Sequence, residues 1–191
     1  MAEFISLYSG SSGNSSVVCC GQRYLIVDMG KGVRTTSAAL KALGLAVSDC
    51  DGILVTHEHS DHIKGVGILS RKYHVPIYAN DRTWQAMERS LGSIAPGSRR
   101  VFESGETFYI GNAGIMPYRI SHDAAEPVGY SFLGGDGNVV YGALCGRDGK
   151  IRFSIYRRWN VHTPKNDSRG VFAHKYRQGP CAVSYTHLRA H

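Results

Sequence analysis

Residues 52 to 62 read Gly-Ile-Leu-Val-Thr-His-Glu-His-Ser-Asp-His, an apolar run followed at once by a cluster of histidines and acids. The apolar part predicts a buried strand, and the polar part predicts a loop that leaves the strand and enters a helix. His57 and His59 are two positions apart, so in extended chain they share one side and can turn toward one point. Asp61 and His62, at the start of the helix, can face a second point close by.

This stretch offers the donor atoms of a metal site. Imidazole nitrogen and carboxylate oxygen both bind Zn²⁺, at about 2.0–2.2 Å. Four such side chains on one strand–loop–helix turn therefore predict a site for two metal ions. The alternative is a solvated, histidine-rich loop that binds nothing. The position favours the metal site, because α/β folds place active sites beyond the carboxyl ends of their strands.

The rest of the first three quarters of the chain predicts mixed α/β layers, with strands alternating with helices before a run of hairpins. Apolar residues at helical spacing predict helices at 33–43 and 63–73, and a third from Asp81, expected as its N-cap, through Leu91. Apolar runs between Gly-rich turns predict strands at 4–8, 17–20, 24–28, 52–56, 76–79, 108–110, 114–120, 128–133 and 139–141.

The pattern His57-x-His59-x-Asp61-His62 is similar to the signature of the metallo-β-lactamase superfamily. Asp28, at the end of a predicted strand, matches the first acidic position of that superfamily, which supports the ligands without binding the metal. Ser121-His122, after the strand that ends at Ile120, matches its third motif. The resemblance implies an αββα sandwich of which this chain holds only the N-terminal part, in residues 1–142.

Three stretches narrow the resemblance to the WalJ/YycJ subgroup, whose members are treated as metal-dependent DNA exonucleases. They are Ser-Gly-Ser-Ser-Gly-Asn-Ser at 9–15, the histidine stretch at 56–62, and Ser-His-Asp-Ala-Ala-Glu-Pro-Val-Gly-Tyr at 121–130. The resemblance covers about residues 3–142. It implies a phosphodiesterase that cleaves DNA with a metal-bound hydroxide. The alternative within the same fold is a lactam or thioester hydrolase.

The resemblance also implies a role for each predicted ligand. His57, His59 and His122 would hold the first metal ion. Asp61 and His62 would bind the second, and Asp61 would also act in catalysis by orienting the hydroxide. The expected cofactors are two divalent ions, Zn²⁺ or Mn²⁺.

Two further ligands of the superfamily are missing from the expected places. One is an Asp that bridges both metals in a Thr-Asp-x-Gly stretch, but Leu144 stands where it is expected. The other is a final His much further along. We therefore expect the second metal site to be incomplete. An alternative is that Cys145 replaces the bridging Asp, with the last ligand drawn from His162, His174 or His187.

The charge of the chain changes near this point. Residues 1–145 hold 12 Lys+Arg and 13 Asp+Glu, a net charge of −1, whereas residues 146–191 hold 10 and 2, a net charge of +8. We interpret residues 143–191 as a basic, irregular tail produced by a frameshift or a chimeric join, and residues 182–191 resemble a translated sequencing adapter. The alternatives are a genuine basic tail that binds nucleic acid and a catalytically inactive, truncated fragment.

Composition excludes several classes of protein. The chain is 42% hydrophobic and 19% charged, as expected of a globular protein. It has no apolar stretch long enough to span a bilayer and no basic and apolar leader at its N-terminus. Five cysteines, two of them adjacent, form neither a disulfide framework nor a Cys-x-x-Cys knuckle. We expect a cytoplasmic protein with DNA as its partner and no membrane association.

Overall fold

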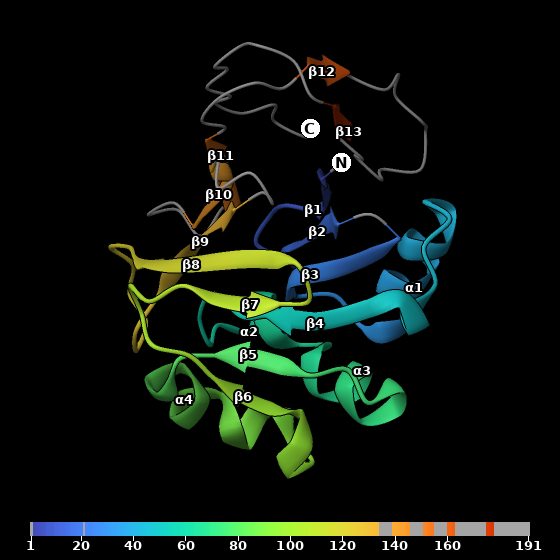
Figure 1. The fold of residues 1–191 in the computed structure, drawn as a ribbon. Coiled ribbons are helices and arrows are strands. Elements are labelled where there is room, and N and C mark those ends of the chain that lie inside the picture. Colours follow the sequence, from blue (N-terminus) through green and yellow to red (C-terminus); the bar gives the residue numbers. More distant parts are fainter. Residues whose placement is uncertain are drawn as a thin grey trace.

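The computed structural model describes residues 2–20, 22–133, 139–145, 151–154, 160–162 and 175–177, with side chains at 4–20 and 22–133. Two β-sheets lie face to face, and helices cover the outer face of the first (Figure 1). This layering agrees with the sandwich that the resemblance implies.

The first sheet has six strands in the order β1-β2-β3-β4-β5-β6. The pairs β1·β2 and β2·β3 are antiparallel, whereas β3, β4, β5 and β6 run parallel, so the carboxyl ends of these four strands meet at one edge. The strands are β1 Ala2–Tyr8, β2 Ser15–Cys20, β3 Arg23–Met29, β4 Cys50–Leu54, β5 Ile77–Ala79 and β6 Arg99–Val101.

The second sheet is antiparallel, in the order β11-β10-β9-β8-β7. Its strands are β7 Phe108–Ile110, β8 Ala113–Arg119, β9 Val128–Leu133, β10 Val139–Cys145 and β11 Ile151–Ser154. A separate pair is formed by β12 Asn160–His162 and β13 Lys175–Arg177.

The helices pack on one face of the first sheet. They are α1 Val33–Ala42, α2 Ser60–Ile63, α3 Val66–Tyr73 and α4 Asp81–Leu91, with short 3₁₀ turns η1 Val47–Asp49 and η2 Pro96–Ser98. Each of the four helices adds buried side chains to one core, which also contains alternate residues of the sheet such as Ile5, Ile26 and Ile53. This alternation is what a strand buried on both faces produces.

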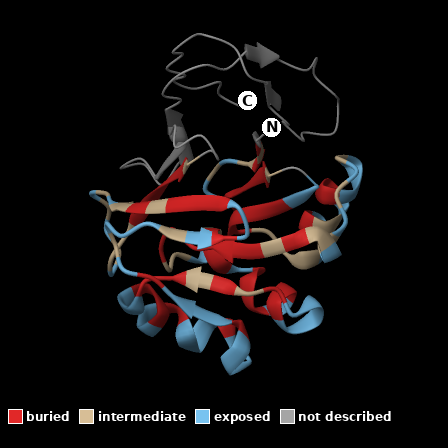
Figure 2. Ribbon diagram, viewed as in Figure 1, coloured by how far each residue is buried: buried red, intermediate tan, exposed pale blue. Residues whose placement is uncertain are grey.

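A second core lies between the two sheets. It holds the intervening residues of the first sheet, such as Phe4, Leu25 and Leu54, packed against Ile115 and Tyr130 of the second. Figure 2 shows the resulting buried strands in both sheets. Among the described residues no helix contributes to this core, so three layers of the four-layer αββα sandwich are present.

Two details of the predicted helices are wrong. The single helix expected over residues 63–73 is two helices, α2 and α3, because Gly65 turns the chain between them and donates its N–H to Met29 O at 2.8 Å. A Cβ at Gly65 would collide with the carbonyl oxygen of Lys31. Asp81 is not an N-cap: the side chain of Asn80 caps α4 by accepting a hydrogen bond from Thr83 N.

Strand β10 continues to Cys145, beyond the expected end at Tyr141. The predicted boundary between 142 and 143 therefore falls inside a strand and stays a prediction. The side chains of Leu144, Cys145, His162, His174 and His187 lie outside the described part of the chain.

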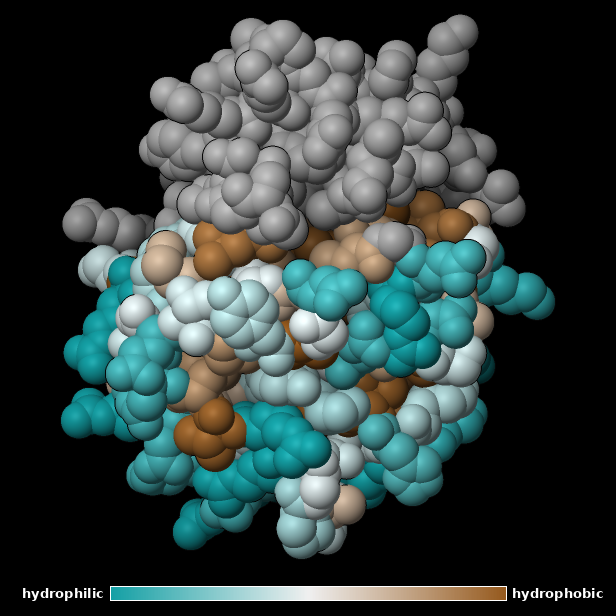
Figure 3. Space-filling view, in the orientation of Figure 1, coloured by the Kyte–Doolittle hydropathy of each residue, from teal (hydrophilic) through white to brown (hydrophobic). Residues whose placement is uncertain are grey.

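The surface of the helical layer is polar. Over α3 and α4, the face in Figure 3 is mostly hydrophilic, with hydrophobic residues scattered singly. None of the helices in the described residues is long and apolar enough to cross a membrane.

Candidate metal centre

The predicted ligands gather at the edge where the parallel strands of the first sheet end. Strand β4 leads directly into residues 56–62, and β8 leads into the loop 120–127 that carries His122. The end of this loop is fixed beside β4, because Val128 N donates a hydrogen bond to Thr56 O at 3.0 Å. Segments far apart in the sequence therefore place their histidines side by side.

His57, His59 and His122 bring three ring nitrogens to one point. Nε2 of His57 lies 3.1 Å from Nδ1 of His59, which lies 3.3 Å from Nε2 of His122. All three atoms fall within 4.8 Å of one another. Nitrogens that bind a tetrahedral zinc ion at about 2.0–2.1 Å are about 3.3–3.4 Å apart, so these residues fit such an ion.

The local environment keeps two of these imidazoles neutral. Burial, followed by the neighbouring His62, His122 and His59, lowers the pKa of His57 to about 2. Burial also lowers the pKa of His122, and His59 adds to that effect. A neutral imidazole presents a lone pair, which is the form that binds a metal.

Asp28 and Thr56 orient the buried histidines. Asp28 is fully buried, and its carboxylate accepts hydrogen bonds from Thr56 N at 2.8 Å and Thr56 Oγ1 at 2.7 Å. Thr56 Oγ1 can then accept from the Nδ1–H of His57, 2.9 Å away. This arrangement assigns the proton of His57 to Nδ1 and turns its Nε2 lone pair toward His59 and His122.

The same carboxylate orients His62. The Nδ1–H of His62 donates to Asp28 Oδ2 at 2.7 Å, so Nε2 carries the lone pair. Asp28 has a φ of 58°, in the left-handed region that non-glycine residues rarely adopt. The strand end is therefore bent so that one acid serves both buried histidines.

Asp61 and His62 form a second group of potential metal ligands beside His57, His59 and His122. Nε2 of His62 lies 3.6 Å from Oδ2 of Asp61, and the rings of His62 and His57 have centroids 4.0 Å apart. His62 is fully buried, whereas the side chain of Asp61 is 27% exposed. All six residues singled out in the sequence thus lie in one cluster at one sheet edge.

Asn14, which the sequence analysis did not single out, completes this second group. Its amide nitrogen lies 3.0 Å from Asp61 Oδ2 and 3.1 Å from His62 Nε2, and its oxygen accepts from Gly10 N at 3.0 Å. The backbones are joined too, since Asn14 N donates to Asp61 O at 2.7 Å. The signal for it in the sequence is the Ser-Gly-Ser-Ser-Gly-Asn-Ser stretch at 9–15, one of the three that narrow the resemblance.

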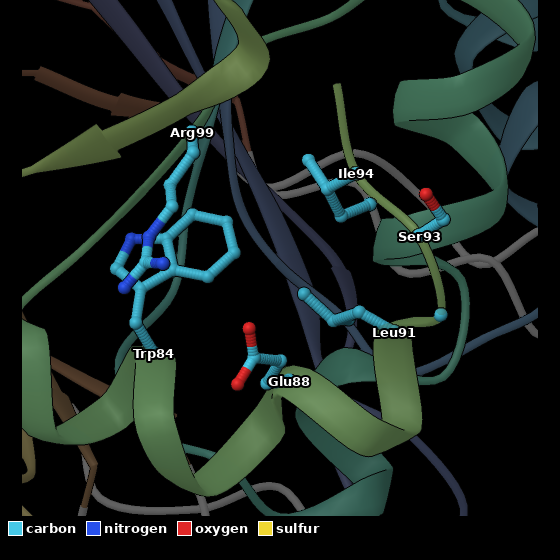
Figure 4. A pocket seen from close by; sticks show the side chains of 7 residues that line it. Trp84, Glu88, Leu91, Ser93, Ile94 and Arg99 are labelled. Atoms are coloured by element: carbon cyan, nitrogen blue, oxygen red, sulfur yellow. The ribbon is translucent and has the colours of Figure 1, made fainter. Parts of the chain in front are cut away.

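A hollow elsewhere on the molecule is separate from this cluster. It measures about 320 Å³ and lies between the end of α4 and the chain that follows, where the Arg99 guanidinium sits 5.1 Å from the centre of the Trp84 ring (Figure 4). Its described lining contains none of the predicted ligands.

Comparison with known proteins agrees with this geometry. A family model described as the metallo-beta-lactamase superfamily matches residues 8–154. The chain belongs to this superfamily. The resemblance seen in the histidine motif is thereby confirmed.

Among curated members of the superfamily, exodeoxyribonuclease YycJ of Bacillus anthracis is 46% identical over 130 residues, which are 68% of this chain and 49% of that protein. Exodeoxyribonuclease WalJ of Streptococcus pneumoniae is 43% identical over 140 residues, 72% of this chain and 52% of that protein. These matches confirm the resemblance to the WalJ/YycJ subgroup. The chain spans about half the length of the curated relatives it matches.

Solved structures of metallo-β-lactamases share the fold. Rm3 metallo-beta-lactamase aligns with a TM-score of 0.57 at 19% identity, over 72% of this chain and 56% of that one. Metallo-beta-lactamase SMB-1 aligns with a TM-score of 0.56 at 18% identity, over 77% and 58%. At such identity the likeness speaks for the fold alone.

Proposed function

We propose that this chain is the N-terminal, metal-binding part of a metal-dependent phosphodiesterase that cleaves DNA. The observation that carries the proposal is the cluster of His57, His59 and His122, whose nitrogens are spaced as the ligands of one metal ion. The names of the two exodeoxyribonuclease relatives support DNA as the substrate. The described cysteines form no disulfide, in keeping with the proposed cytoplasmic location.

The proposed cofactors are two divalent ions, Zn²⁺ or Mn²⁺. His57, His59 and His122 would hold the first, and Asp61 with His62 would bind the second. Bound divalent ions would polarise a phosphoryl oxygen and lower the pKa of a water toward neutrality. In the sequence, Leu144 stands where the superfamily's bridging Asp is expected, and this supports weaker binding of the second ion.

The protein side chains have distinct roles in this proposal. Asp28 and Thr56 keep the imidazoles of His57 and His62 in the tautomers that present Nε2. Asp61 is the more exposed of the two ligands proposed for the second ion. Its carboxylate can therefore accept a hydrogen bond from the attacking water and orient it. Burial of His57 and His62 excludes bulk water from the inner side of the site.

A lactam or thioester hydrolase is the less supported alternative. The solved β-lactamases are below 25% identical to this chain, whereas both exodeoxyribonuclease relatives exceed 40%. The test is turnover of labelled DNA against a chromogenic β-lactam, with Zn²⁺ or Mn²⁺ and then with a chelator. We expect metal-dependent loss of nucleotides from DNA and no lactam hydrolysis; the reverse result would overturn the proposal.

A matched pair of variants connects the activity to the site. His59→Ala removes one nitrogen of the cluster and should abolish metal-dependent cleavage. His74→Asn changes an exposed histidine with a φ of 57°, a conformation that asparagine tolerates, and should leave cleavage unchanged.

The origin of residues 143–191 is tested on the coding DNA. Resequencing across codons 141–149 and translating all frames should reveal a continuation with a Thr-Asp-x-Gly stretch and a later His. If the present codons stand, the frameshift hypothesis is wrong, and binding of a second ion through Cys145 becomes the alternative to test.

A further inference from the structure

Two arginines from different elements converge on one acid next to the metal centre. Arg119, the last residue of β8, places Nη2 3.3 Å from Oε1 of Glu126, and Arg82, in the first turn of α4, places Nε 4.0 Å from Oε2. The three residues line a hollow of about 220 Å³.

The acid is fixed while the arginines remain open to solvent. The Glu126 side chain is 16% exposed and accepts a hydrogen bond from Ser104 Oγ at 2.7 Å, and its backbone carbonyl accepts from Asn80 Nδ2 at 2.8 Å. The side chains of Arg82 and Arg119 are 74% and 76% exposed. The immobilised carboxylate of Glu126 therefore faces two solvent-accessible guanidinium groups. Together, Arg82, Arg119 and Glu126 have a net charge of +1.

The hollow lies along the same sheet edge as the metal ligands. Arg119 pairs with Val128, and Val128 N bonds Thr56 O, the residue before His57. Arg82 follows β5, the strand next to β4. The rest of the hollow is lined by Ile120, Ala125 and Pro127 of the loop that carries His122.

We infer that Arg82 and Arg119 form an anchor for a backbone phosphate of the nucleic acid strand, beside the metal centre. This inference rests on the proposed function, since it names where the substrate backbone would lie. Guanidinium groups bind phosphate through paired hydrogen bonds, and phosphate contacts position a strand without reading its bases. Exposed ion pairs add little to stability, so a second arginine on Glu126 is not needed for folding.

The test measures binding without cleavage. A fluorescent single-stranded DNA oligonucleotide is titrated with the 191-residue protein in EDTA at several salt concentrations. Each lost phosphate contact should reduce the slope of log affinity against log salt by about 0.7 in magnitude. We expect this reduction in Arg82→Gln and in Arg119→Gln. Arg89→Gln, on the same helix but absent from the lining of this hollow, should keep the parent slope.

The direction in which Glu126→Gln changes the affinity for DNA distinguishes a phosphate anchor from a purely structural role. It keeps the acceptor for Ser104 but removes the charge that competes with phosphate, so the oligonucleotide should bind more tightly. If the arginines only clamp the loop through Glu126, this variant should bind no better, and the two arginine variants should lose stability with unchanged salt slopes. Those results would overturn the anchor.

The outcomes for the anchor and for the activity are separable. Salt-dependent binding that responds to Arg82 and Arg119, without metal-dependent cleavage, would support the anchor and contradict the proposed function. Cleavage and binding that are both indifferent to these arginines would support the function and overturn the anchor.

Discussion

The side-chain amide of Asn14 donates a hydrogen bond to Asp61 across 47 residues of sequence, with Nδ2 3.0 Å from Oδ2. The orientation of the amide follows from its neighbours. Its oxygen faces the N–H of Gly10, whereas its nitrogen faces only acceptors: Gly10 O, Asp61 Oδ2 and His62 Nε2. Through Asn14, the turn before β2 thus contacts both Asp61 and His62, the two residues proposed to bind the second ion.

Changes at Asn14 should therefore separate stability from metal binding. Asn14→Ala removes the side-chain hydrogen bonds to Asp61 and to the Gly10 backbone, and it should lower the free energy of unfolding by about 1–3 kcal/mol. Asn14→Asp places a second carboxylate against Asp61, so it should be unstable in EDTA but regain more stability than the parent on adding Zn²⁺. Urea unfolding with and without metal measures both. Equal, metal-independent losses in the two variants would contradict a role at the second ion.

Asp28→Asn should weaken metal binding without disturbing the backbone. Asparagine tolerates the φ of 58° at this position, but its amide cannot accept from Thr56 and His62 as the carboxylate does. Loss of such a supporting acid typically lowers metal affinity about 10- to 100-fold. Competition with a chromogenic chelator measures the affinity. Asp51→Asn, which breaks the surface pair with Arg23, is the control and should leave it unchanged.

The parts of the site that could be predicted from sequence are those with contiguous ligands. His57, His59, Asp61 and His62 occupy one turn after one strand, so their proximity follows from local geometry alone. His122 was found only through the resemblance, because a lone histidine after a strand has no local feature that marks it as a ligand. Its place beside His59 depends on pairing between β8 and β9 and on the Val128–Thr56 bond.

Asn14 and the Arg82–Glu126–Arg119 cluster could not be predicted. A Gly/Ser-rich turn has no periodicity, and the contact of Asn14 with Asp61 depends on the close approach of two loops. Gly30, directly after β3, packs against both loops, since a Cβ there would collide with the Asp61 carbonyl and with Asn14 N. The break at Gly65 was missed for the same reason: a tertiary hydrogen bond to Met29, rather than helix propensity, ends α2.

Metal removal should destabilise the parent protein. A ligand present at about one hundred times its dissociation constant adds about 2.7 kcal/mol to the free energy of unfolding. We expect Zn²⁺ to raise the melting temperature and EDTA to reverse the rise. In His122→Ala the rise should largely disappear, because the triad loses one nitrogen. An undiminished rise in that variant would mean that the stabilising ion binds elsewhere, and His74→Asn controls for surface histidines.

Alkaline pH should weaken the fold partly through Cys50. This thiol is 6% exposed in β4, and burial raises its pKa from 9.0 to about 12. The unfolded chain loses the proton near pH 9 and the folded chain only near pH 12, so the stabilising contribution is complete below pH 9 and is lost as pH rises through that window. The slope attributable to this group approaches about 1.4 kcal/mol per pH unit.

Cys50→Ala should remove that slope while costing some packing. Urea unfolding at pH 8, 9.5 and 11 would then show a smaller loss of stability with pH than the parent shows. Tyr130, whose pKa burial also raises, remains in both proteins and cancels in the comparison. Burial and then Cys50 raise the pKa of Tyr24, so loss of Cys50 also reduces the contribution of Tyr24, in the same direction. An identical pH dependence in parent and variant would show that Cys50 ionises alike in the folded and unfolded chains, contrary to its position in the core.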